Sequence, residues 1–287
     1  NIIFGIDTTM GAAISGIIGI LLFAFKKMGG VLDTTAKLLG VVMLVLIAYV
    51  ACVTNPPVGE AVSHVLMPDQ IPWLATVTLI GGTVGGYITF SGGHRLIDAG
   101  VTGIEHLKDV RRAAFMGLSV DALVRILLFL AVLGVVSMGF TLDAKNPAGS
   151  AFLLGAGQVG HLIFGLVFFC AALTSVVGAA YTSVSFLKTL FKVVEKYEKL
   201  TIMAFIFIST CILIGLGKPA ALLIVAGSLN GLILPITLAV MLVATHKKEI
   251  VGTYKHNRLL YWAGWIVVLV TAYMGITSLQ GMSKLLG

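Results

Sequence analysis

The residues that point most clearly to a chemical role are glycines inside a long apolar segment. Three glycine pairs fall within thirteen residues, in the stretch Gly81-Gly82-Thr83-Val84-Gly85-Gly86-Tyr87 and its continuation Ser91-Gly92-Gly93-His94-Arg95. In hydrocarbon an interrupted helix is found only where it lines a cavity or is buried in protein. The carbonyls freed at such a break can bind a cation, and the freed N–H groups can bind an anion. We therefore predict a broken helix at 81–94 that lines a ligand path, as in transporters.

Close helix packing is the alternative explanation of these glycines. Glycine lets membrane helices approach one another, and a four-residue spacing, such as that of Gly82 and Gly86, is typical of such contacts. Hydroxyl side chains follow in the same stretch, at Thr83, Tyr87, Thr89 and Ser91. This polar content favours the broken helix over simple packing.

Two further apolar segments carry polar side chains that could face the same path. Asn230 lies beside Gly231 and five residues before Pro235. This pattern is typical of a locally opened helix facing a cavity, or of an amide that bonds to another helix. Thr174 and Ser175 begin a polar stripe, in which we expect most hydroxyls to bond to their own helix and one or two to face the path.

Three titratable or charged residues are candidates for coupling or gating. His94 follows the break by about two turns and has a pKa range suited to proton transfer, although a histidine near lipid headgroups is the alternative. Asp121 and Arg125 lie four residues apart in an apolar segment, so they share one helix face. Charges at membrane depth mark either a structural ion pair or a functional pathway.

The composition indicates that the solvent of this chain is lipid. The 287 residues are 58% hydrophobic and 11% charged, whereas a soluble domain has about 25% charged residues. The net charge of +7 comes from basic residues between apolar segments, not from a patch interleaved with aromatics, so no nucleic-acid partner is expected. Three scattered cysteines form no zinc or disulfide pattern. Hydrolase, metalloprotease and Walker A motifs are absent from the sequence, so we expect neither an enzyme nor a cofactor.

About eight apolar segments have the length of a membrane span, which predicts an all-α polytopic protein with one transmembrane domain over 1–287. The expected spans are 6–25, 36–53, 73–99, 113–140, 159–187, 201–216, 220–245 and 259–279.

The connections between these spans alternate in charge. Alternate connections hold 15 of the 19 Lys and Arg residues, and the opposite side holds only Lys145, Lys218 and Lys284. By the positive-inside rule we expect a multi-pass protein of the cell membrane with the basic loops in the cytoplasm and both ends of this chain outside. The lipid bilayer is then its first partner.

Three motifs of the chain resemble the NRAMP family of proton-coupled divalent-metal transporters. The break at 81–94 is similar to the sixth helix of that family, the run from Ala171 to Tyr181 is similar to the eighth, and Leu229 to Pro235 is similar to the tenth. The chain would correspond to helices four to eleven, with the N-terminal helices missing. The resemblance implies a leucine-transporter-like fold of the APC superfamily, with inverted repeats and a central broken-helix site.

The resemblance also implies which residues would hold the substrate. Gly85 stands where the family has a metal-binding Met, Tyr87 where it has a His, and Asn230 where a Gln approaches the metal. Without the thioether, a site of carbonyls, hydroxyl and amide suits a hard cation. We expect substrate binding at Gly85, Gly86, Tyr87 and Asn230, with Thr174 and Ser175 nearby, and Tyr87 and Asn230 as metal ligands.

These expectations combine into a secondary-active transporter that works by alternating access and carries a divalent cation such as Mg²⁺ or Mn²⁺, with proton coupling as a further possibility. Two alternatives stay open. One is a carrier of a small organic solute, such as an amino acid or carboxylate, on the same scaffold. The other is a membrane subunit that transports nothing.

Overall fold

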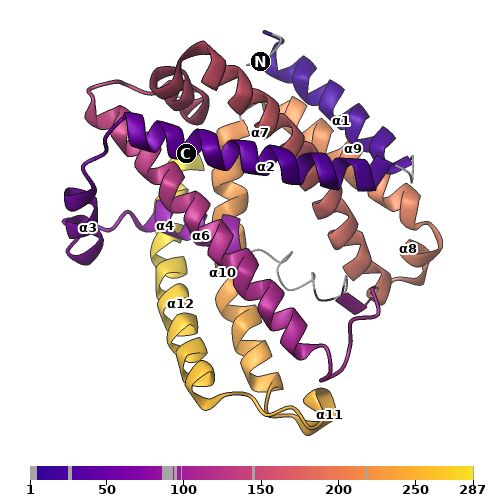
Figure 1. The fold of residues 1–287 in the computed structure, drawn as a ribbon. Helices are drawn as coiled ribbons and strands as arrows, with labels where there is room; N and C mark the ends of the chain where they lie inside the picture. The colour runs from indigo at the N-terminus through magenta and orange to yellow at the C-terminus, as the bar shows by residue number, and fades with distance from the viewer. Residues whose placement is uncertain are drawn as a thin grey trace. The chain divides into compact units, whose positions relative to one another are not determined.

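The computed structural model describes residues 5–24, 28–85, 93, 96–97, 99–143, 146–217 and 219–286. Only the backbone is described at residues 8, 28–37, 84–85, 219–220 and 278–286. The regular elements of this described part are all helical, which confirms the all-α class (Figure 1). The chain forms two compact units, residues 1–68 with 106–217 and residues 69–105 with 218–287.

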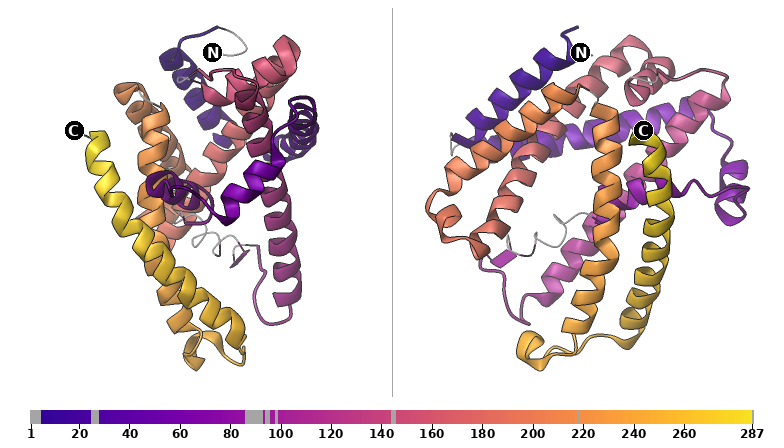
Figure 2. Two further views of the ribbon diagram at one scale, coloured as in Figure 1. Left: turned by 90° about the vertical axis from the view of Figure 1, so that its left-hand side faces the viewer. Right: turned by 180° about the vertical axis from the view of Figure 1, so that it is seen from behind.

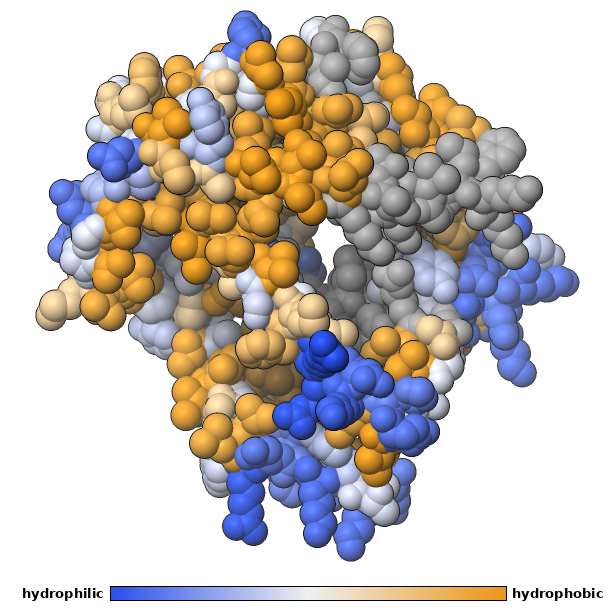
Figure 3. Space-filling view, viewed as in Figure 1, coloured by the Kyte–Doolittle hydropathy of each residue, from blue (hydrophilic) through white to orange (hydrophobic). Residues whose placement is uncertain are grey.

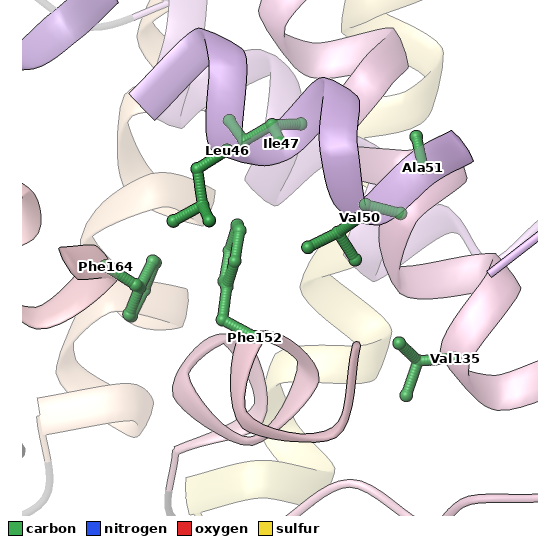
Figure 4. Close-up of a cluster of buried hydrophobic side chains, with 8 residues drawn as sticks. Leu46, Ile47, Val50, Ala51, Val135, Phe152 and Phe164 are labelled. Carbon is green, nitrogen blue, oxygen red and sulfur yellow. The ribbon is translucent and has the colours of Figure 1, made fainter. Parts of the chain in front are cut away.

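The first unit contains seven helices. They are α1 (Thr8–Ala24), α2 (Met28–Val53), α3 (Val58–Leu66), α6 (Leu107–Ser137), α7 (Pro147–Leu190), α8 (Lys192–Lys196) and α9 (Glu198–Leu216). The core of this unit lies where α2 packs on α6 and α7, and Figure 4 shows side chains of these helices converging there. The rings of Phe152 and Phe164 stack at its centre, with their centroids 4.5 Å apart. A second cluster joins α7 and α9.

Helix α7 starts earlier than the sequence pattern predicts. We expected a span from about 159, but the helix begins at Pro147, and the side chain of Asn146 accepts a hydrogen bond from the Gly149 amide at its first turn. Gly157 bends it, with φ 67° and ψ −168°, a conformation open to glycine alone. Across the bend, Nδ1 of His161 lies 2.8 Å from the carbonyl oxygen of Gly149.

The second unit contains the α-helices α4 (Trp73–Ile80), α10 (Pro219–Ala244), α11 (Lys248–Val251) and α12 (Arg258–Leu286) and the π-helix η1 (Gly81–Gly85). The two long helices α10 and α12 run antiparallel, side by side (Figure 2), and α4 packs against both. The ring of Trp73 on α4 meets that of Tyr273 on α12 edge to face, with the centroids 5.5 Å apart. On α12, Gly264 and Gly275 lie against leucines of α10.

Within the described residues, every predicted apolar segment contains a helix, but the helices differ in length from the predicted spans. Five helices of the described residues are long and apolar enough to cross a membrane: α6, α7, α9, α10 and α12. A sixth candidate is the pair of α2 and α3, which is bent by 102°. Helices α1 and α4 with the start of η1 are apolar but shorter. The chain is therefore a polytopic helical membrane protein, and the count of eight spans stays a prediction.

Candidate functional site

The helix that begins at Trp73 changes from α to π at the first glycine pair. Helix α4 ends at Ile80, and Gly81–Gly85 continue as the π-helix η1. A π-helix bonds each N–H to the carbonyl five residues back, so one extra residue fits in the turn and the helix widens. Such turns are rare and frequently mark functional sites. The change falls at the start of the predicted break; the rest of it, Gly86–Gly92 and His94, lies outside the described residues.

Glycine–glycine contacts hold this junction against α10. The backbone of Gly81 is so close to that of Gly227 and Gly231 that no Cβ would fit between them. A Cβ on Gly227 would lie 2.9 Å from the carbonyl oxygen of Thr78, and one on Gly231 would lie 2.8 Å from that of Val77. At Gly82 a Cβ would have no neighbour within 4 Å. Gly81 therefore makes the close contact with α10, whereas the sequence pattern suggested Gly82 for close packing.

A polar contact accompanies this packing. The hydroxyls of Thr78 and Ser228 lie 2.8 Å apart, and the Ser228 side chain is fully buried. The Thr78 hydroxyl donates to the carbonyl oxygen of Leu74 at 2.7 Å, so Ser228 is the donor in the pair. The sequence analysis did not select either residue. The available signal was a hydroxyl in each of two apolar segments, one just before the glycine run and one just before Asn230.

Asn230 lies on the same stretch of α10 but to the side of its contact with α4. At about 100° per residue, it is rotated by roughly 100° from the mean direction of Gly227, Ser228 and Gly231. Its side chain is partly buried. Helix α10 runs continuously through Pro235. Because proline has no N–H, the Gly231 carbonyl receives no hydrogen bond from residue 235, which is the local opening that this helix contains.

The expected partners on α7 belong to the first unit. The Thr174 hydroxyl bonds to its own helix, at 2.9 Å from the Ala171 carbonyl oxygen and 3.2 Å from that of Cys170. Ser175 is exposed. Hydroxyls further along the stripe, at Thr182 and Ser183, also bond back to their helix, as predicted. A joint site of Thr174 and Ser175 with Asn230 stays a prediction.

The charges of α6 form the expected pair. Nε of Arg125 donates to Oδ2 of Asp121 at 2.7 Å, and the two side chains are 46% and 54% exposed. The pair lies at the middle of α6. The geometry satisfies both charges within one helix face, which is what a structural pair requires; a gating role stays a prediction.

The matching family enters at this point. The sequence model of the natural resistance-associated macrophage protein-like (Nramp) family matches residues 1–280. The chain belongs to the Nramp family. Members of this family are transporters, so the match and the long apolar helices support a membrane transporter and not an enzyme.

Two similar sequences are described as membrane proteins. The chain is 51% identical over 279 residues to the uncharacterized membrane protein YcsG of Bacillus subtilis (strain 168), which covers 97% of this chain and 69% of that protein. It is 52% identical over 274 residues to an uncharacterized membrane protein of Haemophilus influenzae, with 96% and 69% covered.

The ligand positions that the Nramp resemblance implies are only partly placed. Gly85 closes the π-helix, Asn230 lies on α10 of the same unit, and Gly86 and Tyr87 lie outside the described residues. Within the described ranges no three His, Cys, Asp or Glu side chains are grouped as a metal site.

Proposed function

We propose that this protein is a secondary transporter of a hard divalent cation, such as Mg²⁺ or Mn²⁺, that works by alternating access in the cell membrane. The observation that carries the proposal is the π-helix Gly81–Gly85 packed against α10 in a chain of the Nramp family. An altered helix in a membrane segment needs partners for its backbone groups, and a bound cation is one such partner.

The donor set favours a hard cation over a soft one. Gly85 brings no side chain, so it provides no thioether sulfur. The remaining groups are backbone carbonyls, the amide oxygen of Asn230 and the hydroxyl of Tyr87. Oxygen donors suit Mg²⁺, Ca²⁺ and Mn²⁺, whereas sulfur donors select later transition metals. Thr174 and Ser175 on α7 of the first unit stay predicted hydroxyl donors for the same ion.

Proton coupling would use the titratable groups that the sequence predicts for it. His94 follows the break, and the Asp121–Arg125 pair offers a carboxylate and a fixed positive charge on α6. A carboxylate that takes up a proton would release Arg125 from the pair. That change of partner is a local event of the kind that biases a helix between two arrangements.

A carrier of a small organic solute is the second candidate. The glycine at position 85 favours it, because the missing side chain leaves room as well as removing a ligand. The two candidates differ in whether any divalent cation is carried or competes.

Flux measurements on the purified full-length protein in liposomes test the proposal. We expect Mg²⁺ or Mn²⁺ uptake with saturation, and Asn230→Ala to weaken the apparent affinity at least about tenfold, the loss that even outer-shell partners of a metal produce. The matched control is Gln70→Ala, an exposed amide in the loop before α4 of the same unit. It should leave uptake unchanged.

Two results would overturn the proposal. If no divalent cation is carried or competes with a transported solute, the cation assignment is wrong. If cations are carried but Asn230→Ala behaves like Gln70→Ala, the site assignment is wrong although the transport class holds.

A further inference from the structure

A basic pocket lies at the connection between α10 and α12 of the second unit. Its volume is about 680 Å³, and it is bounded by the end of α10, by α11 and by the first turn of α12. The charged and hydrogen-bonding side chains that could bind a ligand in this pocket include Lys248, Tyr254, Lys255, His256 and Arg258. None of these residues belongs to the proposed cation path.

The charge of this pocket has one sign. Within residues 245–262, which are all described, three Lys or Arg side chains line the pocket and no Asp or Glu does. The acid nearest in sequence, Glu249 of α11, is not among the lining residues. Lys248, Lys255 and Arg258 are exposed, so their charges are available to a ligand. Such a pocket selects an anion.

Aromatic and histidine side chains give the pocket a defined wall. The Tyr254 hydroxyl lies 3.1 Å from Nδ1 of His256. When that hydroxyl donates to Nδ1, the proton of the neutral imidazole is on Nε2, where it can be donated to an oxygen ligand. The rings of His246 and Tyr261 meet edge to face, at 4.6 Å between centroids, and connect the end of α10 to the start of α12. Gly252, with φ 59° and ψ −123°, allows the turn between them.

The pocket lies where two membrane helices end. The spans Ala221–Ala244 and Arg258–Thr277 flank it. On the first turns of α12, Trp262, which also lines the pocket, is 66% exposed, and the nearby Leu259 and Leu260 are exposed as well. An exposed Trp beside apolar residues at a span end is typical of the headgroup level of a bilayer. Figure 3 shows hydrophilic side chains over the α10–α12 connection and hydrophobic ones along the helices that lead to it.

We propose that this pocket binds the phosphate group of an anionic phospholipid in the cytoplasmic leaflet. The connection belongs to the basic set of loops, which the positive-inside rule assigns to the cytoplasm, where anionic lipids meet basic pockets between helices. Lys255 and Arg258 bind the phosphate oxygens, and His256 donates a further hydrogen bond. The acyl chains extend along the exposed apolar side of α12.

Native mass spectrometry and fluorescence titration of the detergent-purified protein test this assignment. The probes are phosphatidylglycerol, phosphatidylcholine and inorganic phosphate. We expect phosphatidylglycerol to bind at least tenfold more tightly than phosphatidylcholine. The double variant Lys255→Gln/Arg258→Gln should weaken that binding about 30-fold, from the typical contribution of a surface Lys or Arg to anionic-lipid binding. The single variant Arg258→Gln should weaken it about fivefold and serves if the double variant does not fold.

A charge-matched control separates a pocket from general basicity. Lys196→Gln/Lys199→Gln removes the same charge from exposed positions of another basic connection. It should change phosphatidylglycerol binding less than twofold. Equal losses in the two double variants would overturn the proposal. A second result would also overturn it: phosphatidylglycerol binds no better than phosphatidylcholine, while inorganic phosphate binds and loses its binding in Lys255→Gln/Arg258→Gln. The pocket would then hold a free anion.

Discussion

The substitution Gly231→Ala tests whether close packing of α4 against α10 supports the candidate site. Gly231 faces α4 immediately before the π-helix. A Cβ placed there would lie 2.8 Å from the carbonyl oxygen of Val77 and 2.7 Å from its Cγ1. The carbonyl belongs to helical backbone, and the Val77 side chain is buried, so neither can rotate away. The two helices must therefore separate.

The magnitude follows from the overlap. Ordinary van der Waals contact begins at 3.4 Å, so the carbonyl contact falls short by about 0.6 Å. Overpacking of this kind costs typically about 1–3 kcal/mol. Alanine recovers about 0.5–1 kcal/mol relative to glycine within a helix. At the middle of both ranges the net loss of stability is about 1.2 kcal/mol, which corresponds to a Tm lower by roughly 2–5 °C in a protein of this size.

Thermal unfolding in detergent and cation uptake in liposomes measure the two consequences. Gly231→Ala should lower both the Tm and the uptake rate, because a shift of α4 also moves the π-helix. The matched control is Gly82→Ala, where no atom lies within 4 Å of the added Cβ and the Tm should be unchanged or slightly higher. If Gly231→Ala keeps the Tm and uptake of the unmodified protein, the glycine contacts do not determine how α4 is positioned.

Substitutions at three further contacts test each contact individually. Ser228→Ala should cost about 1 kcal/mol, and adding Thr78→Val should cost less than the sum of the single changes, because both remove the same hydrogen bond; additive losses in a melting cycle would contradict this. Asp121→Arg and Arg125→Asp should each lower the Tm, and the double exchange should restore it. If uptake stays low in the double variant although its Tm is restored, the pair has a role in transport. Single variants with an unchanged Tm would show that the pair adds nothing to stability. His161→Phe should lower the Tm by a few degrees through loss of the bond across the α7 bend, and an unchanged Tm would show that Gly157 alone sets the bend.

Apolar runs predicted which parts of the chain are helical, because a membrane helix needs about 20 consecutive apolar residues. They could not predict the ends. The predicted spans 113–140 and 159–187 leave Asn146 and Pro147 in the connection between them, although Asn at the N-cap and Pro at the first helical position are also a helix-start signal. Helix α7 uses that signal and bends at Gly157. A count of apolar residues predicts the length of helix that can face lipid, but it does not predict helical turns that extend beyond that length.

The glycine pairs indicated where the helix departs from regular α geometry, at Gly81, but not the function of each glycine there. Gly81 and Gly82 are adjacent and chemically identical, yet they point about 100° apart on the helix, so only Gly81 meets α10. Which direction faces a neighbour depends on how α4 packs, and that is tertiary information. The Thr78–Ser228 bond joins residues 150 positions apart and was missed for the same reason.

The second unit places two departures from regular hydrogen bonding next to each other. On α4 the α-helix turns into a π-helix at Gly81, and on α10 Pro235 withholds its N–H from the carbonyl of Gly231. The glycine contacts bring Gly231 against the turn that precedes the π-helix. In hydrocarbon such carbonyls need another partner, and neither departure alone would require one to be a ligand. Under the proposed function, the carbonyl oxygens at these two positions are cation donors, and Asn230, which follows Leu229 on α10 to the side of the α4 contact, adds an amide oxygen. Such oxygen donors suit a hard cation.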